Sequence, residues 1–120
     1  MKKDKPNVFI EKCPSRDVIS RLSGKWSILI LSLLKEKPLR FNEIKHQIQG
    51  ISQKVLTENL RSLERDGLVN RRVFTQTPLK VEYNTTRNSN DLLTIIKSLT
   101  DWAEKNCKAL ELQNEIHDKK

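Results

Sequence analysis

The chain has 120 residues, and its 23 Lys and Arg outnumber 15 Asp and Glu to give a net charge of +8 and a pI of about 9.7. This length fits one domain, and the charge favours a polyanionic partner, although a basic surface also serves solubility alone. The longest apolar run, residues 28–34, is too short to span a membrane, and residues 1–6 precede no apolar signal segment, so we expect a single cytoplasmic domain over residues 1–120.

Two helices are expected to open the chain and to serve as scaffold. Residues 15–22 predict a short helix that turns Val18, Ile19 and Leu22 inward. A core helix follows, in which apolar side chains recur at helical spacing: Trp26, Leu29, Ile30, Leu33 and Leu34. Residues 38–41 are expected to add a short strand before the next helix.

A third helix is predicted over residues 42–49. Asn42 is its expected N-cap, Ile44 and Ile48 lie one turn apart on its buried face, and Gly50 ends it. Residues 50–52 alone separate this helix from the next one. A short turn containing Gly between two helices is typical of a helix-turn-helix, whose second helix enters the major groove of DNA.

The helix over residues 52–66 has a marked start, a marked end and a polar outer face. Ser52 is a favourable N-cap, Ile51 can pack on Leu56 as a hydrophobic staple, and Gly67 suits the left-handed residue after a helix. The inward positions are Val55, Leu56, Leu60 and Leu63, and the outward ones are Gln53, Lys54, Thr57, Glu58 and Arg61. Gln, Thr and Arg can read base edges, and Lys54 suits a phosphate. A merely solvated helix has the same pattern, so the neighbouring elements decide between the two interpretations.

Two strand-like runs come next, residues 68–74 and 80–85, separated by a break that contains Pro78. A helix-turn-helix followed by a hairpin predicts a winged helix-turn-helix, mainly α-helical with a small β-hairpin wing. The wing is basic where it would lie against a phosphate backbone. The predicted DNA-binding residues are Ser52, Gln53, Lys54, Thr57 and Arg61 in the helix and Arg71, Arg72 and Lys80 in the wing.

The last helix is predicted from Ser89 to about Ile116. Its apolar stripe comprises Leu92, Ile96, Leu99, Ala103, Cys107 and Leu110, widened by Leu93, Ile95 and Trp102. A small domain cannot bury so long a stripe alone, so we expect a homodimer about a twofold axis, to which residues 8–19 also contribute. The DNA-binding core is then about residues 25–86 and the dimerisation helix about residues 89–116. The expected operator is an inverted repeat with half-sites roughly 34 Å apart.

Several short motifs resemble those of a known family in their order and spacing. They are Cys13-Pro14, Leu22-Ser23-Gly24-Lys25-Trp26, Arg40-Phe41-Asn42-Glu43-Ile44, Gly50-Ile51-Ser52-Gln53-Lys54-Val55-Leu56-Thr57, Val81-Glu82-Tyr83 and Asp101-Trp102. From about Cys13 to Lys105, the chain resembles the HxlR-type winged helix-turn-helix regulators, which are relatives of MarR-type proteins. The resemblance implies a homodimeric, DNA-binding repressor or activator that often acts near its own gene. We expect a repressor.

The two cysteines have different surroundings. Cys13 precedes Pro14, a favoured first helical residue, so its sulfur is expected at a helix N-terminus near Lys12 and Arg16, which favours the thiolate. Cys107 lies on the apolar stripe of the last predicted helix, where it is expected to serve as a small packing residue. The resemblance implies a thiol sensor at Cys13, because some HxlR-type proteins use a cysteine there, and part of that group has a partner cysteine near the C-terminus. Redox sensing by Cys13 and Cys107 and packing roles for both stay open.

Other function classes lack their characteristic residues. The chain has only three Gly and two isolated His, so neither a phosphate-binding loop nor a catalytic base is indicated. It also lacks the Cys-x-x-Cys pair that is typical of a zinc site. We therefore expect no enzyme activity, metal or cofactor. The alternative to an operator-specific regulator is a winged-helix module that binds nucleic acid without sequence preference or docks a protein. An operator preference of about 10³-fold over bulk DNA would separate the two.

Overall fold

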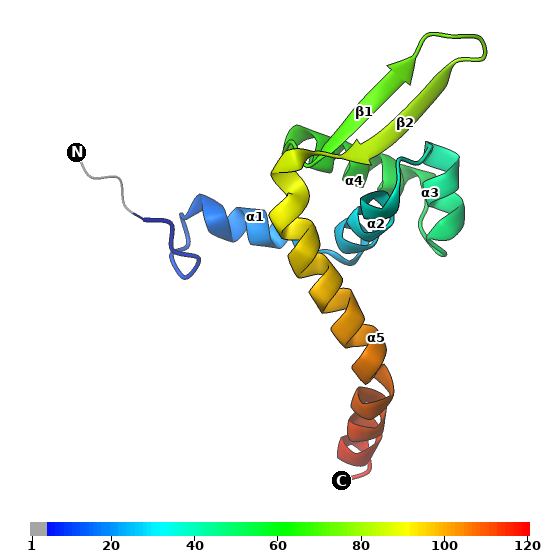
Figure 1. The fold of residues 1–120 in the computed structure, drawn as a ribbon. Helices are drawn as coiled ribbons and strands as arrows, with labels where there is room; N and C mark the ends of the chain where they lie inside the picture. Colours follow the sequence, from blue (N-terminus) through cyan, green and yellow to red (C-terminus); the bar gives the residue numbers. More distant parts are fainter. Residues whose placement is uncertain (1–4) are drawn as a thin grey trace.

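The computed structural model describes residues 5–120 and confirms a winged helix-turn-helix that is mainly α-helical (Figure 1). The elements are α1 (Pro14–Leu22), α2 (Lys25–Glu36), α3 (Phe41–Gln47), α4 (Gln53–Arg65), β1 (Val69–Phe74), β2 (Lys80–Thr85), the short 3-10 helix η1 (Arg87–Ser89) and α5 (Asn90–Asp118). Residues 25–89, from α2 to η1, form a unit that we call the head. The helix α1 projects from one side of the head, and α5 extends far beyond it.

The core lies between α2, α3, α4, the base of the wing and the first turns of α5. Its buried residues are Ile30, Leu31, Leu34, Leu39, Ile44, Ile48, Ile51, Leu56, Leu60, Leu63, Val69, Leu93 and Ile96. The inward positions predicted for α3 are confirmed, as are those of α4, where Val55 is half-buried. On α2 the prediction was partly wrong, because Leu31 is fully buried while Leu29 is 37% exposed. This helix is apolar nearly all round, so periodicity alone does not select its buried face.

Both predicted ends of α4 are confirmed. The Ser52 hydroxyl oxygen accepts a hydrogen bond from the Val55 N–H at 3.1 Å. At the other end, the N–H groups of Gly67 and Leu68 donate to the carbonyls of Glu64 and Leu63, both at 3.0 Å, in a Schellman motif. Gly67 has a φ of +76°, a left-handed conformation that a residue with a side chain rarely adopts.

The start of α3 differs from the prediction. Asn42 lies inside the helix, and Arg40 is the N-cap. The Arg40 N–H donates to the Glu43 carboxylate at 2.8 Å, so the acidic residue in the first turn satisfies the free backbone donor. Because this bond lets the helix begin at Phe41, Asn42 is a helical residue and not the N-cap.

The predicted short strand over residues 38–41 is reduced to one β-bridge. The N–H of Leu39 donates to the Tyr83 carbonyl at 3.0 Å, and the Tyr83 N–H returns a bond to Leu39 at 2.8 Å. The strand cannot extend because α3 already begins at Phe41. The bridge joins β2 to the segment between α2 and α3, and the antiparallel wing packs against α4 through β1.

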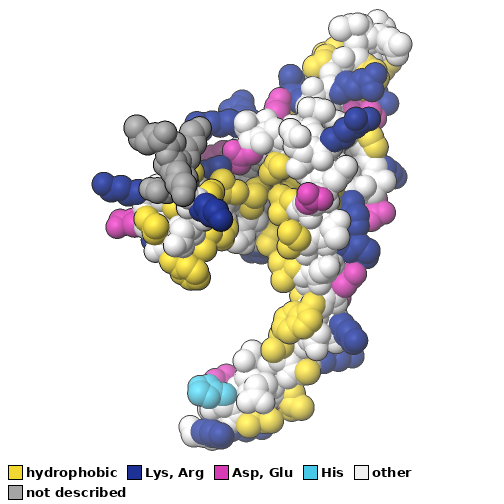
Figure 2. All heavy atoms as spheres, turned by 60° about the vertical axis from the view of Figure 1, so that its left-hand side comes forward, with side chains coloured by type: hydrophobic (Ala, Val, Ile, Leu, Met, Phe, Trp, Pro, Cys, Tyr) yellow, Lys and Arg dark blue, Asp and Glu magenta, His cyan; other side chains and the backbone are white. Residues whose placement is uncertain are grey.

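The two terminal helices expose apolar side chains in the single chain. Val18 and Ile19 of α1 were expected to point inward, but they are 39% and 53% exposed. The helix α5 buries Leu93 and Ile96 and then leaves the head. Its exposed large apolar side chains are Ile95, Leu99, Trp102, Leu110, Leu112 and Ile116. Figure 2 shows hydrophobic side chains gathered on α1, on α5 and in the hollow between them.

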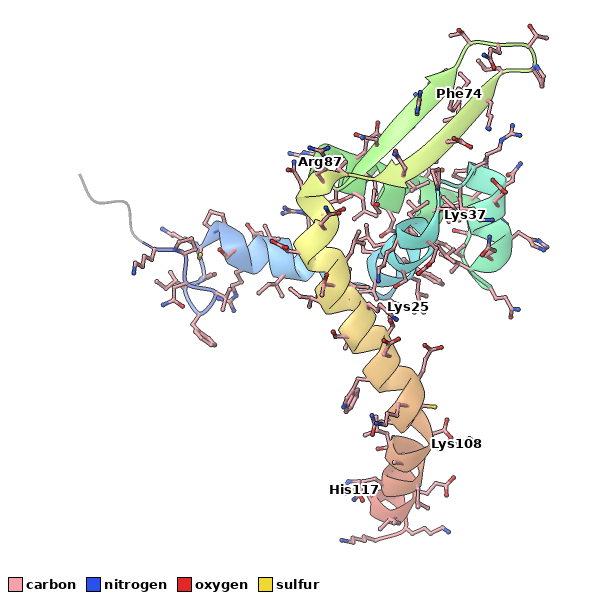
Figure 3. The ribbon with its side chains drawn as sticks, in the orientation of Figure 1. Lys25, Lys37, Phe74, Arg87, Lys108 and His117 are labelled. Atoms are coloured by element: carbon pink, nitrogen blue, oxygen red, sulfur yellow. The ribbon has the colours of Figure 1, made fainter. Side chains whose placement is uncertain are left out.

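The outer half of α5 extends into solvent and carries Lys108 and His117 far from the head (Figure 3). No helix within residues 5–120 combines the length and the apolar character that crossing a membrane requires.

Candidate nucleic-acid interface

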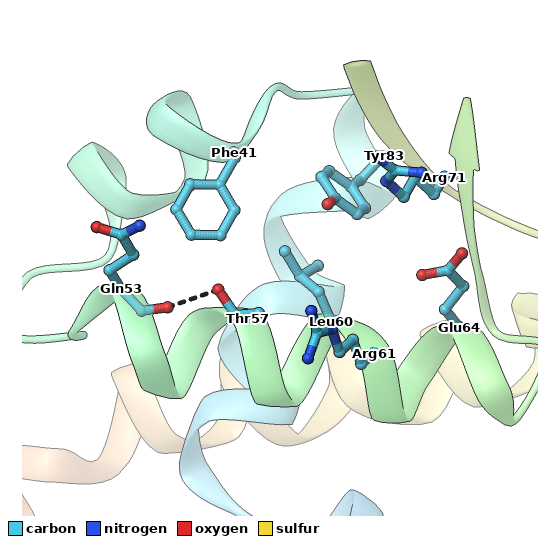
Figure 4. Close-up of a pocket in the computed structure, with 8 residues that line it drawn as sticks. All are labelled: Phe41, Gln53, Thr57, Leu60, Arg61, Glu64, Arg71 and Tyr83. Carbon is cyan, nitrogen blue, oxygen red and sulfur yellow. Dashed lines mark hydrogen bonds between the residues drawn. The ribbon is translucent and has the colours of Figure 1, made fainter. Parts of the chain in front are cut away.

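The outer face of α4 presents side chains that can read bases. Gln53, Lys54 and Arg61 are exposed, and Thr57 is partly exposed. The Thr57 hydroxyl donates to the Gln53 carbonyl at 2.8 Å, so its lone pairs remain available to an amino group of a base (Figure 4). The side-chain oxygen of Ser52 accepts the capping bond, which leaves its hydroxyl proton available to a phosphate oxygen.

A groove with a volume of about 570 Å³ lies between α4, the start of α3 and the wing (Figure 4). Its lining residues are Phe41, Gln53, Thr57, Leu60, Arg61, Glu64, Arg71 and Tyr83. Helix α3 contributes one side chain, α4 five and the hairpin two. The groove therefore brings three of the predicted α4 residues together with one predicted wing residue, Arg71. Amide, hydroxyl and guanidinium groups are the side chains that hydrogen-bond base edges.

The three basic residues of the wing do not share one surface. Successive side chains of a strand alternate between faces, and the register pairs Arg71 with Tyr83, Arg72 with Glu82 and Phe74 with Lys80. Arg71 and Tyr83 therefore face the groove. Arg72, Phe74, Lys80 and Glu82 lie on the opposite face of the hairpin.

That opposite face carries a cluster around the ring of Phe74, at the outer end of β1 (Figure 3). The Arg72 guanidinium carbon lies 4.9 Å from the ring centroid, and the Lys80 ammonium lies 5.1 Å from it. Cations at this distance are attracted by the ring quadrupole. Lys80 also forms an ion pair with Glu82 at 3.1 Å. The ring thus contacts two basic side chains on the outer part of the wing.

Sequence reasoning missed four lining residues of the groove: Phe41, Leu60, Glu64 and Tyr83. Leu60 was predicted only as an inward core position of α4. Glu64 lies seven positions after Thr57 and eleven after Gln53, so helical periodicity alone could have placed it on the reading face. Phe41 and Tyr83 come from other elements. Their presence in the groove depends on how α3 and the wing pack against α4, which no local pattern specifies.

Cys13 is the N-cap residue of α1, as predicted, and is only 8% exposed. A hydrogen bond with the Ser15 side chain lowers the pKa of the thiol, and backbone N–H groups of Ser15, Asn7 and Arg16 act in the same direction, while burial opposes them. The Asn7 N–H lies 3.1 Å from the sulfur. Partial negative charge on sulfur is therefore favoured, and the thiolate is the reactive form of cysteine.

Cys107 is exposed on the outer half of α5, and its thiol lies 3.5 Å from the Glu104 carbonyl oxygen. Both cysteines are free thiols in this single chain. Within residues 5–120, no three His, Cys, Asp or Glu side chains gather into a group that could hold a metal ion.

The sequence model of the HxlR-like helix-turn-helix family matches residues 21–111. The chain belongs to this family. One curated relative, the HTH-type transcriptional regulator YtfH of Escherichia coli K12, is 38% identical over 100 residues, which cover 83% of this chain and 79% of YtfH. The protein is therefore a transcriptional regulator of the helix-turn-helix type.

Solved structures of transcriptional and redox regulators resemble this one closely. The transcriptional regulator YtfH from Salmonella typhimurium is 34% identical and superposes with a TM-score of 0.85, covering 92% of this chain and 99% of that one. The redox regulator HypR in its reduced form is 36% identical with a TM-score of 0.74, covering 82% of this chain and 97% of that one. HypR has also been solved in an oxidised form.

Proposed function

We propose that this regulator binds an inverted-repeat operator as a homodimer and represses the adjacent gene. The observation that carries the proposal is the groove beside α4, where Gln53, Thr57, Arg61 and Arg71 converge from helix and wing. A B-DNA major groove admits one α-helix and presents a different set of donors and acceptors for each base pair. The net charge of +8 adds affinity for the DNA backbone. We place the protein in the cytoplasm, with the DNA that it reads.

The homodimer is supported by the apolar surface of the terminal helices. Leu99, Trp102 and Leu110 are 48%, 54% and 46% exposed on α5, and Ile19 is 53% exposed on α1. An apolar stripe of this length on a monomer typically marks an interface. A second copy supplies the same stripe, and a twofold axis lets α5 of each copy cover its partner. In this division of the chain, residues 25–86 bind DNA and residues 89–116 dimerise.

The DNA-contacting residues divide into two groups. Gln53, Thr57 and Arg61 read bases, with Arg71 entering from the wing side of the same groove. Ser52 and Lys54 contact phosphates at the helix N-terminus, and Arg72 and Lys80 contact the backbone from the other face of the wing. Phosphate contacts fix register without carrying sequence information, so the two groups should respond differently to a change of DNA sequence.

We also propose that the regulator responds to thiol oxidants through Cys13. The lowered pKa of the Cys13 thiol and its position at a helix N-terminus support this role. The redox regulator HypR, a relative, has been solved in two redox forms. In the simplest reaction, the thiols of Cys13 and of Cys107 from the second subunit each lose one proton and one electron to the oxidant diamide, and an S–S bond forms. The bond would fix the angle between the two heads and weaken operator binding.

Footprinting and competition on DNA flanking the gene test the DNA-binding proposal. The wild-type protein should protect an inverted repeat and should prefer it over random DNA by about 10³-fold or more. A protein that binds both equally would instead be a module that packages nucleic acid without sequence preference.

The thiol proposal has its own test, in which wild type, Cys13→Ser and Cys107→Ser are each treated with diamide. Wild type should lose operator affinity, and Cys13→Ser should not respond. On a non-reducing gel, a cross-linked dimer that needs both cysteines supports the intersubunit bond. A response that needs Cys13 and survives Cys107→Ser indicates modification of Cys13 alone by a small thiol. A wild type that does not respond contradicts the proposal.

A further inference from the structure

An ion pair joins α1 to the end of α4. The Arg21 Nε donates to Asp66 Oδ2 at 3.1 Å, and Nη2 donates to Oδ1 at 3.2 Å. Two parallel bonds from a planar guanidinium to a carboxylate fix the orientation of both side chains, which a single contact would not do. The two residues are 45 positions apart in the chain, so the pair is a tertiary contact between two helices.

A second polar contact runs alongside the first. The Ser27 hydroxyl of α2, which is 5% exposed, lies 3.3 Å from the Arg21 carbonyl oxygen and 3.1 Å from Asn59 Oδ1 on α4. Its single proton can be donated to either acceptor. Asn59 in turn donates to the Val55 carbonyl at 2.8 Å. The last turn of α1 is thus connected directly to α4 through the Arg21 side chain, and its backbone carbonyl shares the Ser27 hydroxyl with Asn59 of α4 as alternative acceptors.

Asp66 is well placed to hold α4. It is the C-cap residue, and its N–H donates to the Ser62 carbonyl at 3.0 Å, so its backbone is fixed within the last turn. The next residue, Gly67, accepts a bond of 2.6 Å from the Thr86 hydroxyl at the exit of the wing. The C-terminal turn of α4 is therefore the point where α1, α4 and the wing are connected.

Helix α1 has few other contacts with the head: none of residues 14–22 is buried in the single chain, and Leu22 is partly buried against the core. Arg21 and Asp66 also line a small cavity of about 330 Å³ with Arg61, Ser62 and Arg65 of α4. The ion pair thus lies next to Arg61, which also lines the groove proposed to read bases. A change in the angle between α1 and α4 would move the C-terminal half of the reading helix.

From these contacts we infer that Arg21 and Asp66 are positioning residues that couple the orientation of α1 to that of α4, and so set how α4 reads DNA. The inference rests on the proposed function. Because α1 begins next to Cys13, the pair provides a path by which a displacement of the N-terminal region reaches the reading helix. Neither residue needs to contact DNA for this role.

The test compares Arg21→Ala, Asp66→Asn and the charge swap Arg21→Asp with Asp66→Arg in the full-length protein. Lys97→Ala is the matched control, because it also removes one positive charge and one ion pair, that with Asp101 at 3.0 Å within α5. Operator and random-DNA affinities are measured for each variant. Hydrogen exchange of the amides of residues 63–68 is measured without DNA.

Arg21→Ala should weaken operator binding about fivefold, and random-DNA binding no more than Lys97→Ala does. Asp66→Asn is the sharpest variant, since removing a negative charge strengthens DNA binding electrostatically. Coupling predicts the opposite, a loss of about threefold on the operator. The charge swap should restore affinity to within about twofold of wild type. Amides of residues 63–68 should exchange faster in both single variants than in Lys97→Ala.

Three results would overturn the inference. They are a tighter operator complex for Asp66→Asn, losses for Arg21→Ala that match those of Lys97→Ala, and a charge swap that is no better than Arg21→Ala. If wild type shows no operator preference, the proposed function fails, and exchange of residues 63–68 still decides the coupling. Unchanged exchange in Arg21→Ala then overturns the coupling as well.

Discussion

The head and the two terminal helices solve the burial of apolar side chains in different ways. In the head, Leu56, Leu60 and Ile44 are at most 2% exposed, because three helices and the base of the wing enclose them. On α5, Trp102 and Leu112 are 54% and 58% exposed although their side chains are as apolar as those of the core. The same residue types are thus enclosed in one region and left uncovered in the other.

This difference indicates what each region is for. The head, with the first turns of α5, encloses its own core and positions α4 and the wing within one chain. In the proposed division of the chain, this is the part that binds DNA. The terminal helices carry apolar surface that is exposed in the single chain, and the proposed homodimer would bury it against a second copy. The Arg21–Asp66 ion pair connects α1 to α4, and the buried Leu93 and Ile96 connect α5 to the core.

The largest expected effect is a core substitution in the head. Leu60→Ala removes a side chain that is 2% exposed at the centre of α4, and it should lower the free energy of unfolding by about 2–5 kcal/mol. Chemical denaturation followed by circular dichroism measures the change. Leu79→Ala is the matched control, because this side chain is 64% exposed and lies outside the proposed dimer helix. The same loss there would mean that burial in the head does not set the cost of Leu60→Ala.

A substitution on the terminal helices should break assembly and leave the head folded. Trp102→Glu places a charge on the proposed twofold interface, and it should raise the dimer dissociation constant by roughly 30-fold or more, the effect of losing a hot-spot aromatic residue. Sedimentation at several concentrations measures the constant. Glu104→Gln, an exposed change on the same helix, is the control. A Trp102→Glu protein that stays dimeric at low concentration would place the interface elsewhere.

Local signals explain why much of the head could be predicted from the sequence. Ser52 and Gly67 mark the ends of α4 through bonds that involve only neighbouring residues, so the helix bounds follow from the sequence. The start of α3 was missed for a comparable reason. Asn42 is a common N-cap residue type, but the Glu43 carboxylate accepts a bond from the Arg40 N–H, and the helix starts at Phe41.

Tertiary geometry explains the rest. The sequence grouped Arg71 with Arg72 and Lys80, whereas alternation along the strand and the register divide them between the groove and the outer face of the wing. Val18 and Ile19 were expected inside because their pattern is amphipathic, and a pattern does not tell whether the covering surface belongs to the same chain. The Arg21–Asp66 pair has no signal in either helix alone.

The next prediction concerns the two groups of DNA contacts. Arg61→Ala should cost about 1–3 kcal/mol on the operator and relax specificity at one base pair, because Arg61 lines the groove proposed to read bases. Arg72→Ala should weaken operator and random DNA alike and reduce the salt dependence by about one unit, as the loss of a phosphate contact does. Binding to operator and random DNA at several salt concentrations measures both. Equal behaviour of the two variants would contradict a division between the faces of the wing.

The smallest expected effect lies at the start of α1, where Ser15 lowers the pKa of the Cys13 thiol through its side chain. In a Cys107→Ser background, Ser15→Ala should raise that pKa towards the ordinary thiol value, so alkylation by iodoacetamide should slow at neutral pH and become similar to that of the parent at strongly alkaline pH.

The lowered pKa of the Cys13 thiol in the folded chain also makes stability depend on pH. The thiolate stabilises the folded chain above the unfolded pKa of about 8.5, and this contribution is lost as pH falls through the folded pKa. Ser15→Ala should therefore destabilise the protein slightly at alkaline pH and not at acidic pH. Ser20→Ala, exposed on the same helix, is the control, and an identical pH profile for both variants would mean that Ser15 does not tune the thiol.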